Sequence, residues 1–341
     1  HVNMCEKLLV LVLSKMSNFI PEGGIWMNTQ RPEWNDANNA LVGNGLSMVT
    51  LCYLRRYIIF FRELLLSIEV NTLYISIEVS DWLKCITSIL ESDTLRSYHD
   101  TKDPEIRMKI ICQLGSAFSD YREKIYRNGF SGKQKVKIQK VGVFLDLTMK
   151  WLDETIRSNK KNNLFHAYNI IRTERKHSTA FIDNLYPMLE GQVAALSSGV
   201  LNSDESIDLL GVLFKSKMFR LDQDSFMLYP ENDVISFMEK NIIPTSLVKQ
   251  NKLLSKMLAE ENTDIIDKDI KGQYRFNPDL KNSFDLYEAL EKLEKDDLHN
   301  INMEKQTEKI LEIFEIVFEH RSFTGRSGTM FAYEGIGSIY W

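Results

Sequence analysis

The chain has only four cysteines and seven prolines among 341 residues, and none of its apolar runs is both long and free of charge. The cysteines (Cys5, Cys52, Cys85 and Cys112) are widely spaced, and none stands beside another Cys or a His at metal-ligand spacing. We therefore expect no metal site. The spacing permits disulfides without requiring them, so it leaves localisation open with a lean toward a reducing, cytoplasmic compartment.

Neither of the two most apolar stretches fits a membrane span. Leu8–Leu13 is short and flanked by lysines, and the run Leu46–Leu66 contains three arginines and a glutamate. A span needs about 20 predominantly apolar residues, so both stretches are predicted to be helices buried within protein. No membrane partner is expected.

Concentrated positive charge and the common catalytic signatures are also missing. The formal net charge is −5, and the basic residues are scattered rather than gathered on one stripe, which argues against a nucleic-acid partner. The sequence has no nucleotide-binding glycine fingerprint followed by Lys-Ser/Thr, no His pair at helical spacing and no Gly-x-Ser-x-Gly elbow. No cofactor is predicted.

Helical periodicity is the dominant pattern. Apolar residues recur at three- and four-residue steps within residues 79–90, 106–125, 144–152, 207–214 and 310–318. The cluster Asn202–Glu205 provides an N-cap and first-turn acids for the fourth of these helices. Because no Ser/Gly-rich linker divides the chain, we expect one all-α domain over residues 1–341, built as a solenoid, a bundle or a closed toroid.

Few stretches depart from this pattern. Strand-like alternation is limited to Ile25–Asn28, Ile170–Thr173 and Phe226–Tyr229. The lysine-rich stretches Lys133–Lys140 and Lys160–Asn163 are interpreted as exposed connections or mobile loops. Asn262–Asp279, which contains acids, Gly272 and Pro278, is interpreted as a long irregular segment.

The segment Pro21–Asn39 breaks the helical pattern and is rich in residues that bind sugars. Tryptophan stacks on sugar rings, while Asn and Arg hydrogen-bond hydroxyls; the residues of these types are Arg31, Trp34, Asn35 and Asn38. Asp36 stands two residues after Trp34, and a carboxylate held beside a tryptophan has the raised pKa of a general acid. The alternative is a polar loop that caps a helix, with Trp34 in the core.

A second unusual segment covers residues 324–341. Its four glycines, with Ser, Thr and Arg, could bring backbone N–H groups close to an anion or a sugar. Glycines that alternate with aromatic residues fit a tight helix–helix crossing equally well. His320 precedes this segment, and a lone histidine is more often structural than functional.

Three motifs occur in a particular order along the chain. Trp34-Asn35-Asp36-Ala37 is followed by Val42-Gly43 and Leu46-Ser47 at the start of an apolar helix. Gln192–Val200 reads Gln-x-x-Ala-x-x-Ser-Gly, and Gly325-Arg326-Ser327-Gly328-Thr329 leads to Tyr333, Gly335, Ser338 and Tyr340. In this order they resemble the catalytic domain of inverting glycoside phosphorylases of the cellobiose- and chitobiose-phosphorylase type.

The resemblance implies an (α/α)6 toroid whose inner helix ends and loops build a sugar site. It implies that Asp36 protonates the glycosidic oxygen of an oligosaccharide or glycan, that Gln192 contributes to substrate binding, and that inorganic phosphate is the co-substrate. The chain begins about one helix before the Trp-Asn-Asp motif. We therefore expect much of the first half of the toroid, and the family's N-terminal β-sandwich, to lie upstream in a larger protein.

Glu334 departs from the family pattern, which has Thr at this place in a Tyr-Thr-Gly-Ser loop. A carboxylate there would repel phosphate by about 1 kcal/mol or more at close range. Glu334 could instead be the base of an inverting hydrolase, roughly 6.5–9.5 Å from Asp36. It could also point away while phosphate binds elsewhere, with His320, Arg326, Ser327 and Thr329 as candidates, or pair with an arginine and do no chemistry.

The sequence thus leaves three function classes open. The first is an enzyme that cleaves a glycosidic bond with inversion, by phosphorolysis or hydrolysis. The second is a related but non-catalytic helical module that binds a glycan or a protein, which the substitution at Glu334 favours. The third is a purely structural helical scaffold, which predicts that Trp34, Asp36 and Glu334 do not face one cavity.

Overall fold

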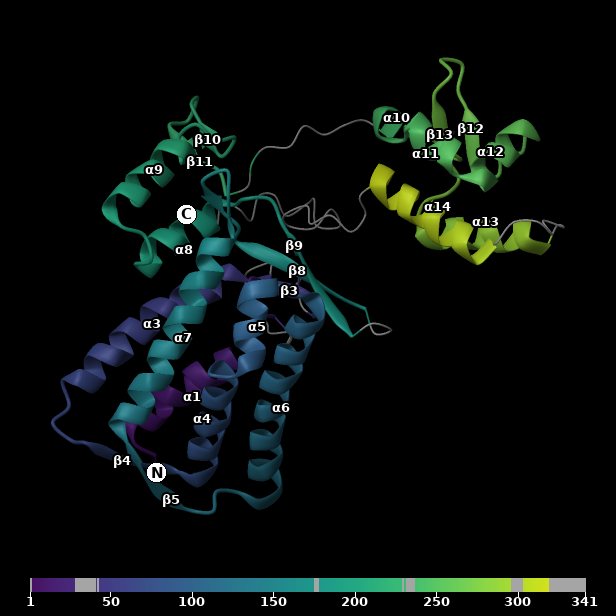
Figure 1. Cartoon of the computed structure of the whole chain (residues 1–341). Helices are drawn as coiled ribbons and strands as arrows, with labels where there is room; N and C mark the ends of the chain where they lie inside the picture. The colour runs from purple at the N-terminus through teal and green to yellow at the C-terminus, as the bar shows by residue number, and fades with distance from the viewer. Residues whose placement is uncertain are drawn as a thin grey trace. The chain divides into compact units, whose positions relative to one another are not determined.

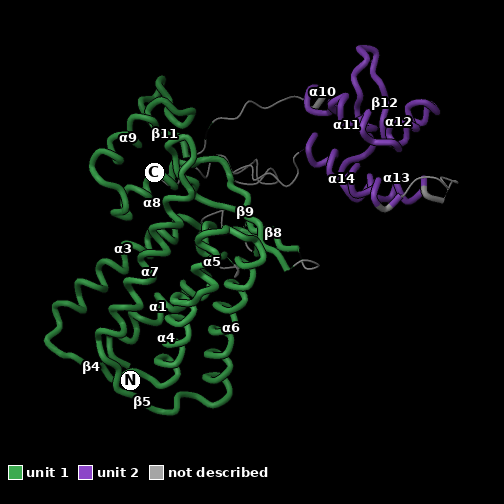
Figure 2. The backbone as a smooth tube through the Cα atoms, in the orientation of Figure 1, with its two compact units in different colours: residues 1–231, 325–341 green, residues 232–324 purple. Residues whose placement is uncertain are grey.

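The computed structural model describes residues 2–27, 41, 43–174, 178–228, 230, 237–295 and 303–318. These residues fall into two compact units, and the single domain expected over residues 1–341 stays a prediction. Unit 1 takes its described residues from 2–230 and unit 2 from 237–318; Figure 2 shows them in green and purple. No helix within these described ranges is long and apolar enough to cross a membrane.

Unit 1 contains most of the helices that the periodicity predicted. They are α1 (Met4–Met16), α3 (Met48–Leu66), α4 (Ile77–Leu90), α5 (Asp93–Thr101), α6 (Pro104–Asn128), α7 (Ile138–Ser158), α8 (Leu189–Ser198) and α9 (Ser203–Leu213) (Figure 1). Local signals set several helix starts. Asp103 caps α6 ahead of Pro104, and Asn202 with Glu205 forms a reciprocal capping box on α9, as the sequence predicted.

The helices of unit 1 pack around one apolar core. Helix α3 packs against α7 and α8, α4 packs against α6 and α7, and α1 contacts both α3 and α4. The side chains with no exposed surface include Leu9, Leu51, Ile86, Leu114 and Leu145, each from a different helix. Burial of such side chains contributes about 1.5–3 kcal/mol each.

A five-stranded antiparallel sheet overturns the predicted all-α class. Its strands, in spatial order, are β1 (Phe19–Ile20), β2 (Gly24–Trp26), β3 (Gly45–Ser47), β8 (Tyr168–Glu174) and β9 (Thr179–Asn184). Helix α6 contacts both edge strands, β1 and β9. The (α/α)6 toroid is therefore wrong for this chain. Strand-like alternation had indicated parts of β2 and β8. The strands β1 and β3 have only two and three residues, too few for periodicity to reveal, and β3 pairs with a strand more than 120 positions away.

Two of the expected irregular stretches are ordered strands. Most of Lys133–Lys140 forms β5 (Lys133–Lys137), which pairs with β4 (Thr72–Ser76), and then the first turn of α7. Lys160–Asn163 includes β6 (Lys160–Lys161), which pairs with β7 (Leu164–Phe165). The exposed lysines of these strands led to the interpretation as connections, because an edge strand does not need a continuous run of buried residues.

Unit 2 is a smaller helical unit with one hairpin. Its elements are α10 (Phe237–Lys240), α11 (Thr245–Gln250), α12 (Lys252–Ala259), β12 (Ile266–Lys268), β13 (Tyr274–Phe276), α13 (Ser283–Lys295) and α14 (Met303–Phe318). The hairpin lies within the stretch interpreted as irregular, so that interpretation was wrong. Phe276 packs against Phe314 of α14 with ring centroids 5.0 Å apart. The two-stranded hairpin of β10 (Phe219–Arg220) and β11 (Ser225–Phe226) belongs to unit 1.

Candidate functional site

The Trp-Asn-Asp segment is attached to the five-stranded sheet at both of its ends. The Met27 N–H donates to the Gly45 carbonyl at 2.9 Å, and the Gly43 N–H donates to the Met27 carbonyl at 2.7 Å. The Trp26 indole N–H also donates to the Gly43 carbonyl, at 3.0 Å. Met27 and Gly43, which lie on either side of Asp36 in the sequence, are therefore together at one end of the β2–β3 pair.

Strand β2 requires glycine where it meets β3. Gly24 has a φ of +124°, and a Cβ there would lie 2.9 Å from the Ser47 carbonyl oxygen. At Gly23 a Cβ would lie 2.4 Å from the Leu46 side chain. The two glycines therefore let the backbones of β2 and β3 approach each other closely. We call Met27, Gly43 and Gly45, which pair at the end of these strands, the stem of the Asp36 segment.

A buried ionic network holds the turn between β1 and β2. The Glu22 carboxylate accepts hydrogen bonds from the Tyr98 hydroxyl at 2.7 Å and from the Arg107 guanidinium at 2.8 Å. Arg107 also donates to the Tyr98 hydroxyl and to the Ala180 carbonyl of β9, both at 2.8 Å. Thus α5, α6 and β9 all meet at the turn that precedes β2.

A second carboxylate extends this network toward solvent. The Lys102 ammonium lies 2.6 Å from the Glu154 carboxylate of α7 and 3.4 Å from that of Glu22. His99 of α5 lies 3.5 Å from the Glu154 carboxylate. Lys102 ends α5 in the left-handed conformation with a φ of 54°, which directs the chain into the capping residue of α6.

The electrostatics keep Glu22 ionised rather than ready to donate a proton. Burial acts to raise the Glu22 pKa, but hydrogen bonds from Tyr98 and Arg107 and the positive charges of Lys102 and Arg107 outweigh it, so the pKa lies below its usual value. Desolvation acts to lower the Lys102 pKa, but the hydrogen bond to Glu154 and the negative charges of Glu22 and Glu154 outweigh it, so this pKa lies above its usual value. A paired carboxylate of this kind holds structure and does not serve as a general acid near neutral pH.

Three asparagines connect the same turn to the sheet. The Asn159 side chain donates to the Glu22 carbonyl at 2.6 Å, and the Asn169 side chain donates to the Gly23 carbonyl at 2.7 Å. Asn169 and Asn184 both donate to the Asn159 amide oxygen, at 2.7 and 3.4 Å. Asn159 and Asn169 are buried, and these bonds satisfy turn carbonyls that would otherwise lack partners.

Gln192 is the one predicted site residue that lies within the described residues. It is on α8, and its side chain is 0% exposed. Its amide oxygen accepts from the Phe165 N–H at 2.8 Å, and its amide nitrogen donates to the carbonyls of Phe165 at 2.7 Å and Met188 at 2.8 Å. The contacts described for Gln192 are therefore with the backbone on either side of β8, and its role in sugar binding stays a prediction.

The rest of the Gln-x-x-Ala-x-x-Ser-Gly motif comprises the last part of α8 and the glycine that follows it. Gly199 follows α8 in the left-handed conformation, with a φ of 73°. The Ser198 carbonyl accepts a 2.6 Å hydrogen bond from Arg55, whose guanidinium also pairs with Asp153 of α7 at 2.5 Å. This pairing attaches the end of α8 to α3 and α7.

The remaining predicted site residues lie outside the described residues. They are Arg31, Trp34, Asn35, Asp36, Asn38, His320, Arg326, Ser327, Thr329 and Glu334. Their convergence on one cleft, and the separation of the Asp36 and Glu334 carboxyls, stay predictions.

Sequence reasoning overlooked the ionic network at the turn between β1 and β2. A signal was available, because Arg107 interrupts the apolar stripe of α6 beside Ile106 and Ile110. A charged residue on a buried helix face requires a partner of opposite charge. The sequence does not show that the partner is Glu22, since 85 positions separate the two residues.

A protein-family model matches the chain within unit 2. The GH149 phosphorylase insertion domain 2 matches residues 234–321, about a quarter of the 341 residues. No curated protein matches. The match supports a relationship to glycoside phosphorylases, but not to the cellobiose- and chitobiose-phosphorylase type in particular.

Proposed function

We propose that this chain belongs to an enzyme that phosphorolyses a glycosidic bond in an oligosaccharide, with Asp36 as the general acid. The observation that carries the proposal is the match of residues 234–321 to an insertion domain of GH149 phosphorylases. The three ordered motifs of the sequence lie outside these residues and resemble glycoside phosphorylases as well. The family match and the motifs therefore favour the same class of reaction independently.

The stem of the Asp36 segment is consistent with this role. A general acid must be held within about 0.5 Å of its productive position by a rigid surrounding structure. Met27 and Gly43, on either side of that segment in the sequence, are joined by a backbone hydrogen bond of 2.7 Å. The turn held by Glu22 and Arg107 precedes β2, and Met27 follows this strand.

In the proposed reaction, Asp36 donates its proton to the glycosidic oxygen as the bond from that oxygen to the anomeric carbon breaks. An oxygen of inorganic phosphate attacks the anomeric carbon from the opposite face. The products are a sugar 1-phosphate of inverted configuration and an oligosaccharide shortened by that sugar. Arg326, Ser327, Thr329 and His320 are the proposed phosphate ligands.

Incubating the chain with a panel of disaccharides and short oligosaccharides, with and without phosphate, tests the proposal. We expect release of sugar 1-phosphate only when phosphate is present, with inversion visible by proton NMR. Asp36→Asn should lower turnover at least about 100-fold, because general acid catalysis contributes 10²–10⁴-fold. Full turnover by Asp36→Asn would remove Asp36 from the mechanism.

Two alternatives follow from Glu334, which stands where the resembled family has threonine. If Glu334 activates water, the chain hydrolyses the bond without phosphate, and Glu334→Gln abolishes that activity. If the site is non-catalytic, oligosaccharides bind without turnover, and their affinity is unchanged in Asp36→Asn. The phosphate dependence of product release separates both from phosphorolysis.

A further inference from the structure

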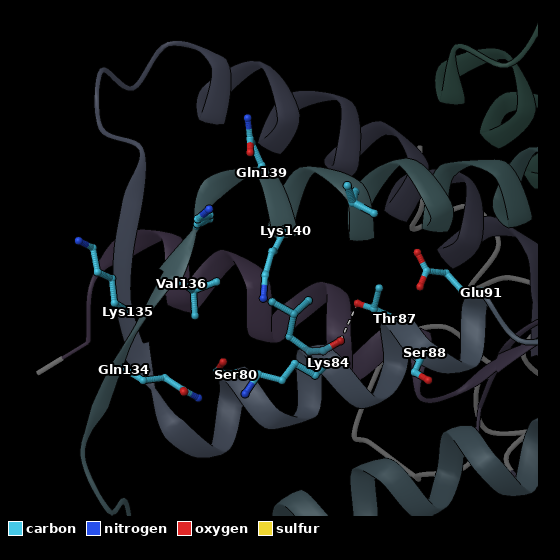
Figure 3. Close-up of a pocket in the computed structure, with 13 residues that line it drawn as sticks. Ser80, Lys84, Thr87, Ser88, Glu91, Gln134, Lys135, Val136, Gln139 and Lys140 are labelled. Atoms are coloured by element: carbon cyan, nitrogen blue, oxygen red, sulfur yellow. Dashed lines mark hydrogen bonds between the residues drawn. The ribbon is translucent and has the colours of Figure 1, made fainter.

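A pocket of about 750 Å³ lies in unit 1 between α4, β5 and the first turn of α7. Figure 3 shows its lining residues, which none of the sequence motifs includes. The floor is apolar: Leu83 and Val136 are buried members of the core, and Val143 of α7 extends it. Pockets for small ligands commonly enclose about 300–1,000 Å³ over such a floor.

The charge around this pocket is predominantly positive. Its lining includes four lysines and one carboxylate: Lys84, Lys135, Lys137, Lys140 and Glu91. Lys84 pairs at 2.9 Å with Asp81 on the helix surface, whereas Lys140 forms no ion pair with another described residue. Figure 3 shows Lys140 extending from α7 toward α4, and Lys84 lying along α4 toward Ser80. An anionic group bound between the two lysines would be attracted by both ammonium charges.

A buried hydroxyl faces the same space. Ser80 lines the pocket, is 1% exposed, and has no hydrogen-bond partner among the described residues. Most buried hydroxyls are paired, so an unpaired one on a pocket floor is available to a ligand. Gln134 lies nearby on β5 and adds an amide to the polar groups at this end of the pocket.

The pocket is separate from the stem of the Asp36 segment. Helix α3 follows β3 at that stem and runs for 19 residues, about 28 Å, before the chain enters β4, the partner of β5. Figure 1 shows β4 and β5 at one end of the helices of unit 1 and β3 with β8 at the other.

We propose that this pocket binds a phosphorylated sugar, as a second site distinct from the Asp36 segment. Lys84 and Lys140 hold the phosphate as point charges, and Ser80 and Gln134 hydrogen-bond sugar hydroxyls. The apolar floor contacts the carbon skeleton. No aromatic side chain lines the pocket among the described residues, so the affinity for neutral sugars, which need a stacking surface, is low.

Isothermal titration of the full chain with glucose 1-phosphate, glucose 6-phosphate, glucose and inorganic phosphate tests this site. We expect one or both sugar phosphates to bind more tightly than inorganic phosphate, and glucose to show no binding. Lys84→Gln with Lys140→Gln should weaken sugar phosphate binding roughly tenfold or more. Lys150→Gln, an exposed lysine of α7 outside the pocket, is the matched control and should leave the affinity unchanged.

Two further variants separate this site from the proposed active site. Ser80→Ala, which removes only the hydroxyl and adds no bulk, should weaken sugar phosphate binding several-fold while leaving unfolding by urea cooperative. Asp36→Asn should leave binding at the pocket intact even where it abolishes turnover. Equal affinity for inorganic phosphate and sugar phosphates, or binding unaffected by the lysine pair, would overturn the proposal.

Discussion

The Arg107 guanidinium and the Glu22 carboxylate, 85 positions apart in the chain, meet at 2.8 Å beneath the turn that leads into β2. Both side chains are largely removed from water, at 8% and 22% exposure. The pair joins a long helix to a short turn in the sheet. It thereby connects the helical core to the stem of the segment that contains Asp36.

Arg107→Met should destabilise unit 1 by about 3 kcal/mol, because it leaves the Glu22 carboxylate without its buried guanidinium partner. Unfolding in urea, followed by tryptophan fluorescence, measures this loss. Residues 232–324 contain no tryptophan, so the signal is free of unit 2. Arg96→Met, which breaks an exposed pair with Asp93, is the control and should change stability little. Equal effects of the two substitutions would contradict a special role for Arg107.

Low pH should reduce the free energy of unfolding of unit 1, because Glu22 becomes protonated. Its pKa in the folded chain lies below the usual 4.5, so its ionised form contributes stability above about pH 4.5. That contribution is lost as the pH falls through the lower, folded pKa. Urea unfolding of wild type and Glu22→Gln between pH 3 and 6 should show a steeper acid loss for wild type. Parallel pH profiles for the two proteins would show that Glu22 is not linked to folding in this way.

Two glycine-to-alanine substitutions should change the free energy of unfolding in opposite directions. A Cβ at Gly191 would lie 2.8 Å from the Phe165 carbonyl oxygen and 2.9 Å from the Ala167 nitrogen. Gly191→Ala should therefore cost about 1–3 kcal/mol, because the clash is with backbone. A methyl group on Gly142 of α7 would meet nothing within 4 Å, so Gly142→Ala should stabilise by about 0.5–1 kcal/mol. Urea midpoints that move in the same direction would refute the packing argument.

Gln192→Leu should destabilise unit 1 by about 3 kcal/mol. It removes one acceptor and two donors that pair with buried backbone groups of Phe165 and Met188. Val193→Ala on the exposed face of the same helix is the control and should have a small effect. If Gln192→Leu keeps wild-type stability and loses only oligosaccharide binding, then the role of Gln192 is to bind the substrate instead.

The sequence by itself determined the elements whose signals are local. Apolar spacing located the main helices, and Asn202 with Glu205 placed the start of α9, because a helix satisfies its own backbone within a few residues. These features depend on contacts three to four positions apart, which can be compared directly along the sequence.

Only the tertiary structure decided the sheet, the ionic network and the lysine-lined pocket. Strand β3 has three residues and pairs with β8, and Glu22 pairs with Arg107 across 85 positions. The pocket brings α4 together with β5 across more than 40 positions. Such contacts have no local pattern, since their partners are selected by the packing of the whole unit. The predicted all-α class failed for this physical reason.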